Sequence, residues 1–468
     1  MKINFIKITA SVTFATVSLA AQAAEFVACE DANTLASLKG SVCAKLQTPL
    51  NFDKPAAGTV SLFIRKFPSE KKTKGTVWLI TGGPGESGAS MYAQLKTLRR
   101  SFPDFDLIIP DHRGTGYSSR LCPAEESIAS PGGSNLSGAE WDTCYSDIAR
   151  NPERAMQFSI TNAAHDLRVM IQKNPSSKPV YLYGVSYGSQ LVLRLFELGA
   201  IPVKGLVLDS LVPLQTAPKW ELSRRSQVLD DIGRKLLKQC DENDECHQMM
   251  GAPGEQVLAG LLEKAKLHPE MISKIRGGNL KQFLGSLLDF PPLRARIPYL
   301  IKDLESGSEK ELASILQKSD RLADSFGEFP QLPPSIPLVG MISSSENNLR
   351  PELSAAELKA EDENLLFSSS LPGYLVKPAL PLYQRDKYFG KDDAHLPPTL
   401  VLQGSMDPKT HYEGALEHIQ LMRAHGKVNL VTVTGAPHFI AMFAPDCFAR
   451  ASRAFIQGRL KTDQSCRM

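Results

Sequence analysis

Three signatures that would point to a particular ligand are missing from this sequence. Its 468 residues contain no long run of Lys or Arg, and the formal net charge is only +3, which argues against a dedicated nucleic-acid binder. No CxxC pair occurs, which argues against a structural zinc site. Beyond the N-terminal segment, no stretch is long and apolar enough to span a bilayer. We therefore expect a globular protein with no nucleic-acid partner, no metal, no cofactor and no stable membrane insertion.

The N-terminus has the three parts of a secretory signal peptide. Two early lysines precede the uncharged, largely apolar residues 8–20, and Ala-Gln-Ala at 21–23 fits a small-x-small cleavage site. We therefore expect residues 1–23 to be removed and the mature chain, beginning at Ala24, to be periplasmic or secreted. An uncleaved membrane anchor is the alternative, although the apolar run is shorter than the ~20 residues that a spanning helix needs.

Export changes the interpretation of the eight cysteines. In an oxidising compartment an even number of cysteines favours disulfides, although eight cysteines allow many pairings. A calcium site in the acidic segment 240–246 is a weak alternative, because the segment lacks the spacing of an EF-hand loop. Close spacing along the chain favours four local pairs: Cys29 with Cys43, Cys122 with Cys144, Cys240 with Cys246, and Cys447 with Cys466.

Strand-like apolar runs alternate with helix-like segments along most of the chain. This alternation predicts an α/β fold, in which a mostly parallel sheet has helices on both faces. A helix is expected over residues 162–174, just before one of the strands. The expected strands are residues 58–67, 75–85, 105–116, 179–184, 203–211, 397–408 and 428–438.

The alternation stops between about residues 215 and 390, where Leu, Lys, Glu and Ser recur with helical periodicity. We expect a mainly helical insertion over residues 216–390, which we call the cap. It would separate an N-terminal part of the core (24–215) from a C-terminal part (391–468). An independent C-terminal domain does not fit, because strand-like segments resume after the cap.

The sequence Gly-Val-Ser-Tyr-Gly at 184–188 has the form of a nucleophile elbow. An apolar run precedes it and a helical pattern follows, so Ser186 would lie on a sharp turn between a strand and a helix. Such a turn exposes the serine hydroxyl and directs the helix N-terminus at the developing oxyanion. Because a bare GxSxG is common, the interpretation needs an acid and a histidine in the right order.

Asp407 and His438 supply that order. Each follows one of the last two predicted strands, which gives the chain order Ser, Asp, His of this enzyme class. Asp209 is the competing acid, because it ends an earlier strand. We favour Asp407, since it directly precedes the loop that contains His438, whereas Asp209 leads into the cap. The other histidines, among them His112, His165 and His411, are interpreted as structural or surface residues.

A Gly-rich turn at residues 79–88 completes the predicted site. A tetrahedral intermediate needs two backbone N–H donors, one from the residue after the nucleophile and one from a loop of this kind. We expect Tyr187 to supply the first donor and Gly83, or less favourably Gly82, the second. A phosphate-binding loop does not fit, because the Gly-Lys-Ser/Thr ending is missing and Pro84 lacks an N–H.

Five short motifs together resemble the prolyl iminopeptidase and tripeptidyl aminopeptidase group of α/β-hydrolases, and most closely its secreted tripeptidyl-aminopeptidase-like branch. The sequence departs from the usual pattern with Thr81, Glu86 and His112, none of which belongs to the predicted triad. The motifs are GGPG (82–85), DHRGTGYS (111–118), GVSYGS (184–189), GSMDP (404–408) and GAPHF (435–439).

The resemblance implies a serine exopeptidase that removes residues or short peptides from free N-termini, with the cap over the active site. Cap carboxylates would hold the substrate ammonium group, and Glu221, Asp230 and Asp231 are among many candidates that the sequence does not separate. A carboxylesterase or lipase-type enzyme with the same triad is the alternative. A non-catalytic binding protein is disfavoured because no triad residue is missing.

Overall fold

The computed structural model describes residues 24–324, 329–331 and 333–468. The predicted leader, residues 1–23, lies outside this part of the chain. Within the described residues, no helix combines the length and the apolar character that crossing a membrane requires.

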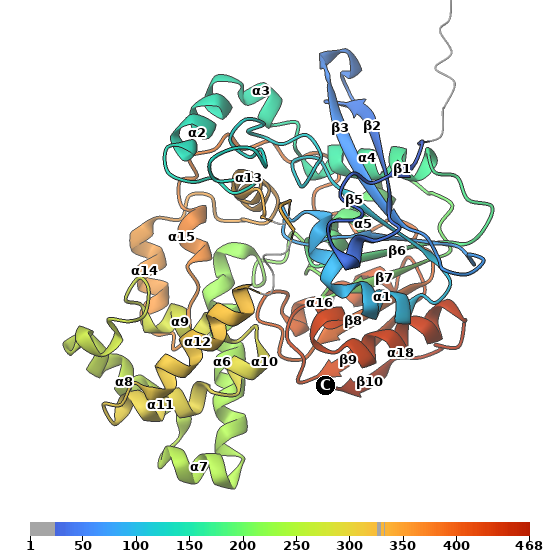
Figure 1. Cartoon of the computed structure of the whole chain (residues 1–468). Coiled ribbons are helices and arrows are strands. Elements are labelled where there is room, and N and C mark those ends of the chain that lie inside the picture. The colour runs from blue at the N-terminus through green and yellow to red at the C-terminus, as the bar shows by residue number, and fades with distance from the viewer. Residues whose placement is uncertain (1–23, 325–328, 332) are drawn as a thin grey trace, which may run out of the picture.

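The described strands form one ten-stranded sheet in the order β1-β2-β3-β5-β4-β6-β7-β8-β9-β10 (Figure 1). The strand pairs from β5 to β10 are parallel, whereas β1–β2, β2–β3 and β3–β5 are antiparallel. The predicted α/β class with a mostly parallel sheet is thus confirmed. The strand bounds are β1 Val27–Ala28, β2 Val42–Pro49, β3 Thr59–Phe67, β4 Thr76–Ile80, β5 Asp106–Asp111, β6 Val180–Val185, β7 Gly205–Asp209, β8 Thr399–Gly404, β9 Val428–Thr434 and β10 Gln464–Arg467.

Each predicted strand is present, but β1, β2 and β10 were not predicted. β1 and β10 are the two edge strands of the sheet, and β2 is the strand next to β1. Few side chains of these three strands are buried. β10, for example, has the sequence Gln-Ser-Cys-Arg and is largely exposed. A search for apolar runs does not detect such segments.

Alternating side chains of the central strands fill two separate cores, one on each face of the sheet. In β6, Val180 and Leu182 belong to one core, and Tyr181, Tyr183 and Val185 belong to the other. Successive side chains of a strand point to opposite faces, and a parallel strand covered on both faces is apolar throughout. Each such buried side chain contributes about 1.5–3 kcal/mol, so β6 is a rigid base for the turn that follows it.

The core helices cover both faces of the sheet (Figure 1). Helices α4 and α5 pack together against the first core, and α1 and α18 pack together against the second. The helix expected over 162–174 corresponds to α4. The bounds are α1 Leu95–Ser101, α2 Glu140–Arg150, α3 Pro152–Ala155, α4 Ile160–Gln172, α5 Tyr187–Glu197, α16 Tyr412–Met422, α17 Ile440–Phe443 and α18 Pro445–Ile456.

The remaining α-helices all lie between β7 and β8 and form the cap at the left of Figure 1. Most of them share a third apolar core, which also takes in Met406 from the loop after β8. Their bounds are α6 Arg225–Asp241, α7 Asp244–Met250, α8 Gly254–Leu267, α9 Leu280–Leu287, α10 Pro291–Arg294, α11 Ile297–Glu305, α12 Lys310–Asp324, α13 Ile336–Glu346, α14 Ala355–Glu363 and α15 Leu371–Leu375.

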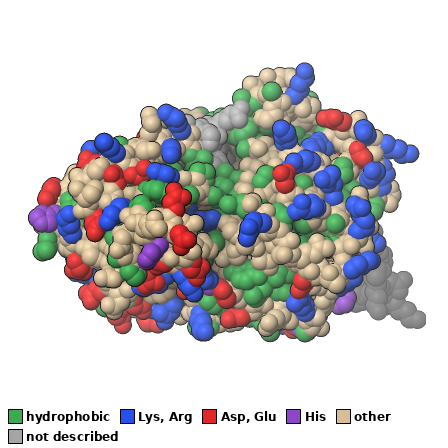
Figure 2. Space-filling view, turned by 90° about the horizontal axis from the view of Figure 1, so that it is seen from below, with side chains coloured by type: hydrophobic (Ala, Val, Ile, Leu, Met, Phe, Trp, Pro, Cys, Tyr) green, Lys and Arg blue, Asp and Glu red, His purple; other side chains and the backbone are tan. Residues whose placement is uncertain are grey.

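The cap is attached to the loops at the carboxyl end of the sheet. Arg294 of α10 donates to the carbonyl of Gly435 at 2.6 Å, beyond β9. Asp289, just before α10, pairs with Lys409 at 3.2 Å, beyond β8. On the face shown in Figure 2, acidic side chains are frequent over the cap half at the left, whereas Lys and Arg are prominent over the core half. The cap thus lies over the ends of β8 and β9.

The eight cysteines are paired as the sequence analysis expects. The structure joins Cys29–Cys43, Cys122–Cys144, Cys240–Cys246 and Cys447–Cys466, and no cysteine of the described chain is free. Three of the bonds lie in the core: Cys29–Cys43 links the segment after β1 to β2, Cys122–Cys144 links the segment before α2 to α2, and Cys447–Cys466 links α18 to β10. The fourth closes the turn between α6 and α7 inside the cap.

Peptide mapping of the mature protein without reduction is expected to recover these four cross-linked pairs. Replacing both Cys122 and Cys144 with serine should lower the free energy of unfolding by about 2–4 kcal/mol, because the unfolded chain would no longer be constrained. Chemical denaturation monitored by circular dichroism measures this loss. Free thiols in the unreduced digest, or a cross-pair such as Cys29 with Cys466, would contradict the assignment.

Candidate active site

Ser186 lies on a strained turn between β6 and α5. Its backbone φ is +54°, a conformation that residues other than glycine seldom adopt. The flanking glycines are required by close packing: a Cβ on Gly184 would lie 2.6 Å from the carbonyl oxygen of Gly188, and one on Gly188 would lie 2.4 Å from that of Ile80. The sequence 184–188 therefore forms the sharp elbow that its pattern predicts.

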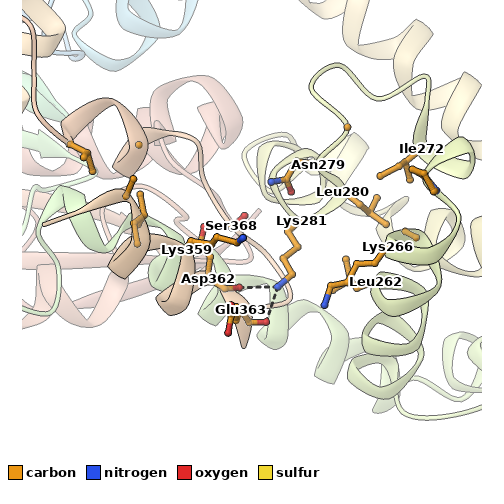
Figure 3. A pocket seen from close by; sticks show the side chains of 17 residues that line it. Leu262, Lys266, Ile272, Asn279, Leu280, Lys281, Lys359, Asp362, Glu363 and Ser368 are labelled. Atoms are coloured by element: carbon orange, nitrogen blue, oxygen red, sulfur yellow. Dashed lines mark hydrogen bonds between the residues drawn. The ribbon is translucent and has the colours of Figure 1, made fainter.

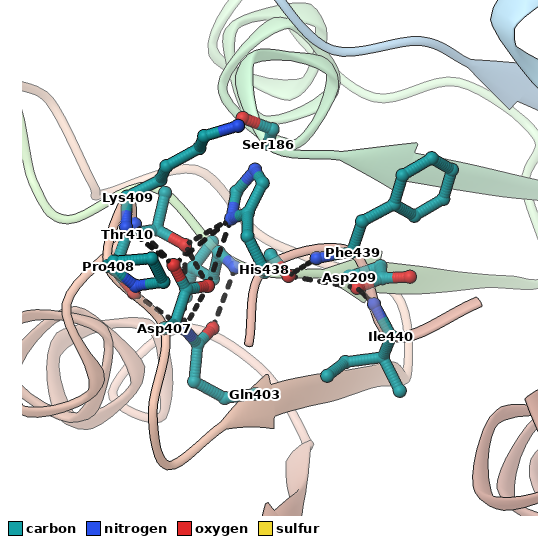
Figure 4. A network of polar contacts seen from close by, with 12 residues as sticks. Ser186, Asp209, Gln403, Asp407, Pro408, Lys409, Thr410, His438, Phe439 and Ile440 are labelled. Carbon is teal, nitrogen blue, oxygen red and sulfur yellow. Dashed lines mark hydrogen bonds and ion pairs between the residues drawn. The ribbon is translucent and has the colours of Figure 1, made fainter. Parts of the chain in front are cut away.

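Asp407 and His438 meet beside this elbow although they follow different strands. The Nδ1 atom of His438 lies 2.9 Å from Oδ2 of Asp407 and 3.2 Å from Oδ1. Figure 4 shows the imidazole between the carboxylate of Asp407 and the hydroxyl of Ser186. Ser186 and His438 also line the same cavity, so the three predicted residues are brought together at the carboxyl ends of β6, β8 and β9.

Several neighbours hold the Asp407 carboxylate, which is fully buried. The backbone N–H groups of Lys409 and Thr410 each donate to Oδ1 at 2.8 Å, and the Thr410 hydroxyl donates to Oδ2 at 2.8 Å. Burial alone would raise the pKa of Asp407, but the attraction of His438 and these hydrogen bonds lower it below its ordinary value. The carboxylate is therefore kept charged, as orienting and stabilising an imidazolium requires.

Thr410 and Gln403 are supporting residues that the sequence analysis missed. The Thr410 hydroxyl lies 3.3 Å from Nδ1 of His438, and the Gln403 amide donates to Asp407 at 3.2 Å. Both are buried. Thr410 stands three residues after the acid and could have been flagged by that short spacing, whereas Gln403 looks like an ordinary strand residue.

Asp209, the competing acid, supports the histidine loop instead. Its carboxylate accepts hydrogen bonds from the backbone N–H groups of Ile440 and Ala441 at 2.8 and 2.9 Å. The hydroxyls of Tyr183 and Ser210 donate to it at 3.0 Å each. Burial raises the pKa of Asp209, and these four donors partly oppose that rise. The Asp209 carboxylate thus fixes the backbone just after His438. Among the described residues, none of its hydrogen bonds goes to the His438 imidazole.

The two expected oxyanion donors lie near Ser186. Tyr187 is the first residue of α5, so its backbone N–H belongs to the unpaired donors of a helix N-terminus. Gly83 follows β4, the strand beside β6, and lines both cavities that contain Ser186. Gly82, the second choice, is also close, since a Cβ there would lie 3.0 Å from that of Ser186.

Two cavities meet at Ser186. The first, of about 210 Å³, contains His438 and has aromatic walls from Phe290, Phe439 and Phe443. The second, of about 90 Å³, extends along the start of α5 past Tyr187. A larger groove of about 680 Å³ lies within the cap near Lys281 (Figure 3), but no triad residue lines it. The two small cavities are therefore the places where a substrate of Ser186 would bind.

Five Asp, Glu, Lys and Arg side chains line these cavities. Glu86 and Asp289 line the first, Glu221 and Arg225 line the second, and Lys409 lines both. Burial raises the pKa of Glu86, which Lys409 and His438 oppose. The pKa of Lys409 is raised chiefly by Asp289, with burial acting against this rise. Of the five, the sequence analysis named Glu86, as a departure from the resembled family, and Glu221, as a candidate cap carboxylate.

The cap carboxylates named from the sequence have other partners. Glu221 accepts from the backbone N–H of Ser223 at 2.9 Å and pairs with Arg350. Asp230 accepts from two backbone N–H groups after α14 and pairs with Arg234 at 2.6 Å. The third, Asp231, lies 2.8 Å from the ring of His411, which also stacks on Trp220 and holds the cap to the core.

Two family profiles match the chain, and each extends a short way into the cap. A profile described as "alpha/beta hydrolase fold" matches residues 75–234, which contain the elbow. One described as "TAP-like protein" matches residues 378–466, which contain Asp407 and His438. The chain has the α/β-hydrolase fold. This confirms the resemblance drawn from the motifs, and the Ser-His-Asp arrangement at the site is that of a serine hydrolase.

The α/β-hydrolase is similar to two mycobacterial proteins. Serine protease Hip1 of Mycobacterium tuberculosis and that of Mycobacterium bovis are each 27% identical to it over 246 residues, which is 48% of this chain and 46% of theirs. The chain thus spans about half the length of these relatives. Among solved structures, a hydrolase from Pseudomonas aeruginosa matches at 15% identity with a TM-score of 0.38, covering 92% of this chain and 98% of its own.

Proposed function

We propose that this α/β-hydrolase is an exported serine aminopeptidase, which cleaves residues or short peptides from free N-termini. The similarity to serine protease Hip1 and the TAP-like match support a peptidase. Export is supported by the signal-peptide pattern of the sequence and by the four disulfides, which persist mainly in oxidising compartments.

The residues that line the first cavity support the proposal that the substrate has a free N-terminus. The cavity places the carboxyl groups of Glu86 and Asp289 in the same space of about 210 Å³ as Ser186 and His438. A peptide whose first carbonyl is at Ser186 has its ammonium group within a few bonds of that carbonyl. Carboxylates in a half-enclosed cavity suit a cation there, and the aromatic walls suit an apolar first side chain. Asp289 belongs to the cap, as the sequence analysis expects of a group that binds the ammonium, but it is not one of the three carboxylates named there, and Glu86 belongs to the core.

The mechanism follows from the geometry of the triad. His438 accepts the hydroxyl proton while Oγ of Ser186 attacks the substrate carbonyl carbon, and the backbone N–H groups of Tyr187 and Gly83 donate to the oxyanion. The C–N bond then breaks, and His438 gives its proton to the leaving amine. Water, deprotonated by His438, next attacks the acyl-enzyme and releases the acid. Asp407 orients the imidazole and stabilises its charged form throughout.

N-acetylation of a peptide substrate is expected to lower kcat/KM by about 100-fold or more. The acetyl group removes the positive charge that Glu86 and Asp289 would bind. Loss of such a contact between charged groups typically costs a few kcal/mol, and each 1.4 kcal/mol is tenfold. The measurement compares free and N-acetylated peptides of the same sequence and includes a short-chain ester.

A Glu86→Gln variant extends this test, because it should reduce the preference for the free amine. Glu242→Gln is the control, since Glu242 is exposed, pairs only at 3.9 Å with Lys238 and lines neither cavity at Ser186. Equal rates on the two peptides would remove the exopeptidase proposal. Faster hydrolysis of the ester in that case would favour the alternative, a carboxylesterase or lipase-type enzyme.

A further inference from the structure

The second cavity at Ser186 has an electrostatic character opposite to that of the first. It is lined by Ser186 and Tyr187 and by two cationic side chains, Arg225 and Lys409. Glu221 is the carboxylate on its wall, but that side chain is already paired with Arg350 and accepts hydrogen bonds from Ser223. The free charge in this cavity is therefore positive.

Arg225 is poorly satisfied by the protein. It is the first residue of α6, and within the described chain its one hydrogen bond is a long contact of 3.4 Å from Nη1 to the carbonyl of Pro408. A guanidinium has five N–H donors, so most of them remain available. Burial lowers the pKa of Arg225 and nearby Asp289 and Asp407 oppose this, but a guanidinium stays charged at any physiological pH.

Lys409 lies between the two cavities. Its backbone N–H holds Asp407, and its side chain reaches over His438 toward Ser186 in Figure 4. The ammonium group pairs with Asp289 at 3.2 Å, on the side of the first cavity. It therefore adds a positive charge beside that of Arg225, but this charge is already paired with Asp289, so Arg225 is the less satisfied of the two cations.

This arrangement implies a direction for the substrate. If the ammonium group binds Glu86 and Asp289, the acyl residue occupies the first cavity, and the chain beyond the scissile bond passes Ser186 into the second. There it meets Arg225 within a space of about 90 Å³, small enough for only a short continuation of the chain. A carboxylate is the group of a peptide that a guanidinium binds best, because two parallel N–H donors match its two oxygens.

We propose that Arg225 and Lys409 bind a carboxylate on the leaving-group side of the scissile bond, so that the preferred substrates are short peptides with a free C-terminus or peptides with an acidic residue just after the cleaved bond. The inference rests on the proposed aminopeptidase function and narrows its substrate class.

The test is a set of leucine-initiated peptides of increasing length, each prepared as the C-terminal acid and as the amide. For the shortest peptide that is cleaved, the acid should have a kcat/KM about 10- to 100-fold higher than the amide, as expected for a hydrogen bond between charged groups. The preference should fall as the peptide lengthens, and added salt should weaken it. Peptide amides with aspartate or asparagine after the scissile bond show whether a side-chain carboxylate is bound in the same way.

Arg225→Gln should bring the acid-to-amide ratio close to one, and Arg225→Lys should retain part of it. Arg224→Gln is the matched control and should leave the ratio unchanged, because Arg224 pairs weakly with Glu361 and lines neither cavity. Thermal unfolding of each variant checks that the fold is intact. Equal rates of the wild-type protein on acids and amides of every length overturn this inference while the aminopeptidase proposal stands. Hydrolysis of an ester but of no peptide overturns both.

Discussion

Replacing Ser186 with alanine is expected to lower kcat by about a millionfold, the size of effect seen when a triad serine is removed from a serine protease. The loss should be this large because the serine forms the covalent acyl intermediate, and without it His438 has no nucleophile on the protein to activate. The fold should be kept, since alanine removes one hydroxyl from a cavity wall. Initial rates on the best free-amine peptide, with far-UV circular dichroism on the same sample, measure both.

Ser176→Ala is a suitable control for this change. Ser176 is exposed and its hydroxyl bonds only to Lys178 within the described chain, so its loss should not alter kcat. A serine-reactive phosphonate followed by peptide mapping gives an independent answer. Labelling at any residue other than Ser186 would disprove the assignment.

Replacing Asp407 with asparagine should lower kcat by about 10⁴-fold. The side chain keeps its shape and its burial, but the amide presents one acceptor in place of two charged oxygens. His438 is then no longer held in the tautomer that accepts a proton from Ser186, and its imidazolium is not stabilised. Rates should be compared at saturating substrate, where kcat reports chemistry rather than binding.

The same substitution at Asp209 provides the contrast. Asp209 holds the backbone after His438 through Ile440 and Ala441, so Asp209→Asn should reduce the stability of the fold by about 1–3 kcal/mol and affect kcat less than the change at Asp407. A larger loss of kcat at Asp209 than at Asp407 would reverse the two roles.

The residues of the site that could be predicted are those that lie in a short local sequence pattern at the end of a recognisable strand. The elbow around Ser186 needs small residues at fixed offsets, because backbone atoms pack against Gly184 and Gly188 at distances that exclude a Cβ. Asp407 and His438 could be placed because the carboxyl ends of parallel strands lie at one edge of a sheet. The strands themselves were visible because their apolar character continues on both faces.

Asp289, Arg225 and Lys409, which line the two cavities, could not be predicted in this way. Asp289 stands between two cap helices, more than a hundred residues from Lys409 in sequence, and only the packing of the cap on the core brings the two together. Arg225 looks like any cationic residue at the start of a surface helix until Pro408 and the cavity lie beside it. No local pattern encodes such a contact.

The attachment of the cap also limits how this enzyme can be re-engineered. Met406 is packed into the apolar core of the cap, Pro408 accepts from Arg225, and Lys409 pairs with Asp289. The loop that positions the catalytic acid is therefore built partly from cap contacts. A cap grafted from a relative would have to bring its own version of residues 406–409, because a foreign surface at this point would shift Asp407 as well as the substrate walls. A change of cap that alters the substrate range would therefore also alter the position of Asp407, unless the cap and residues 406–409 are exchanged together.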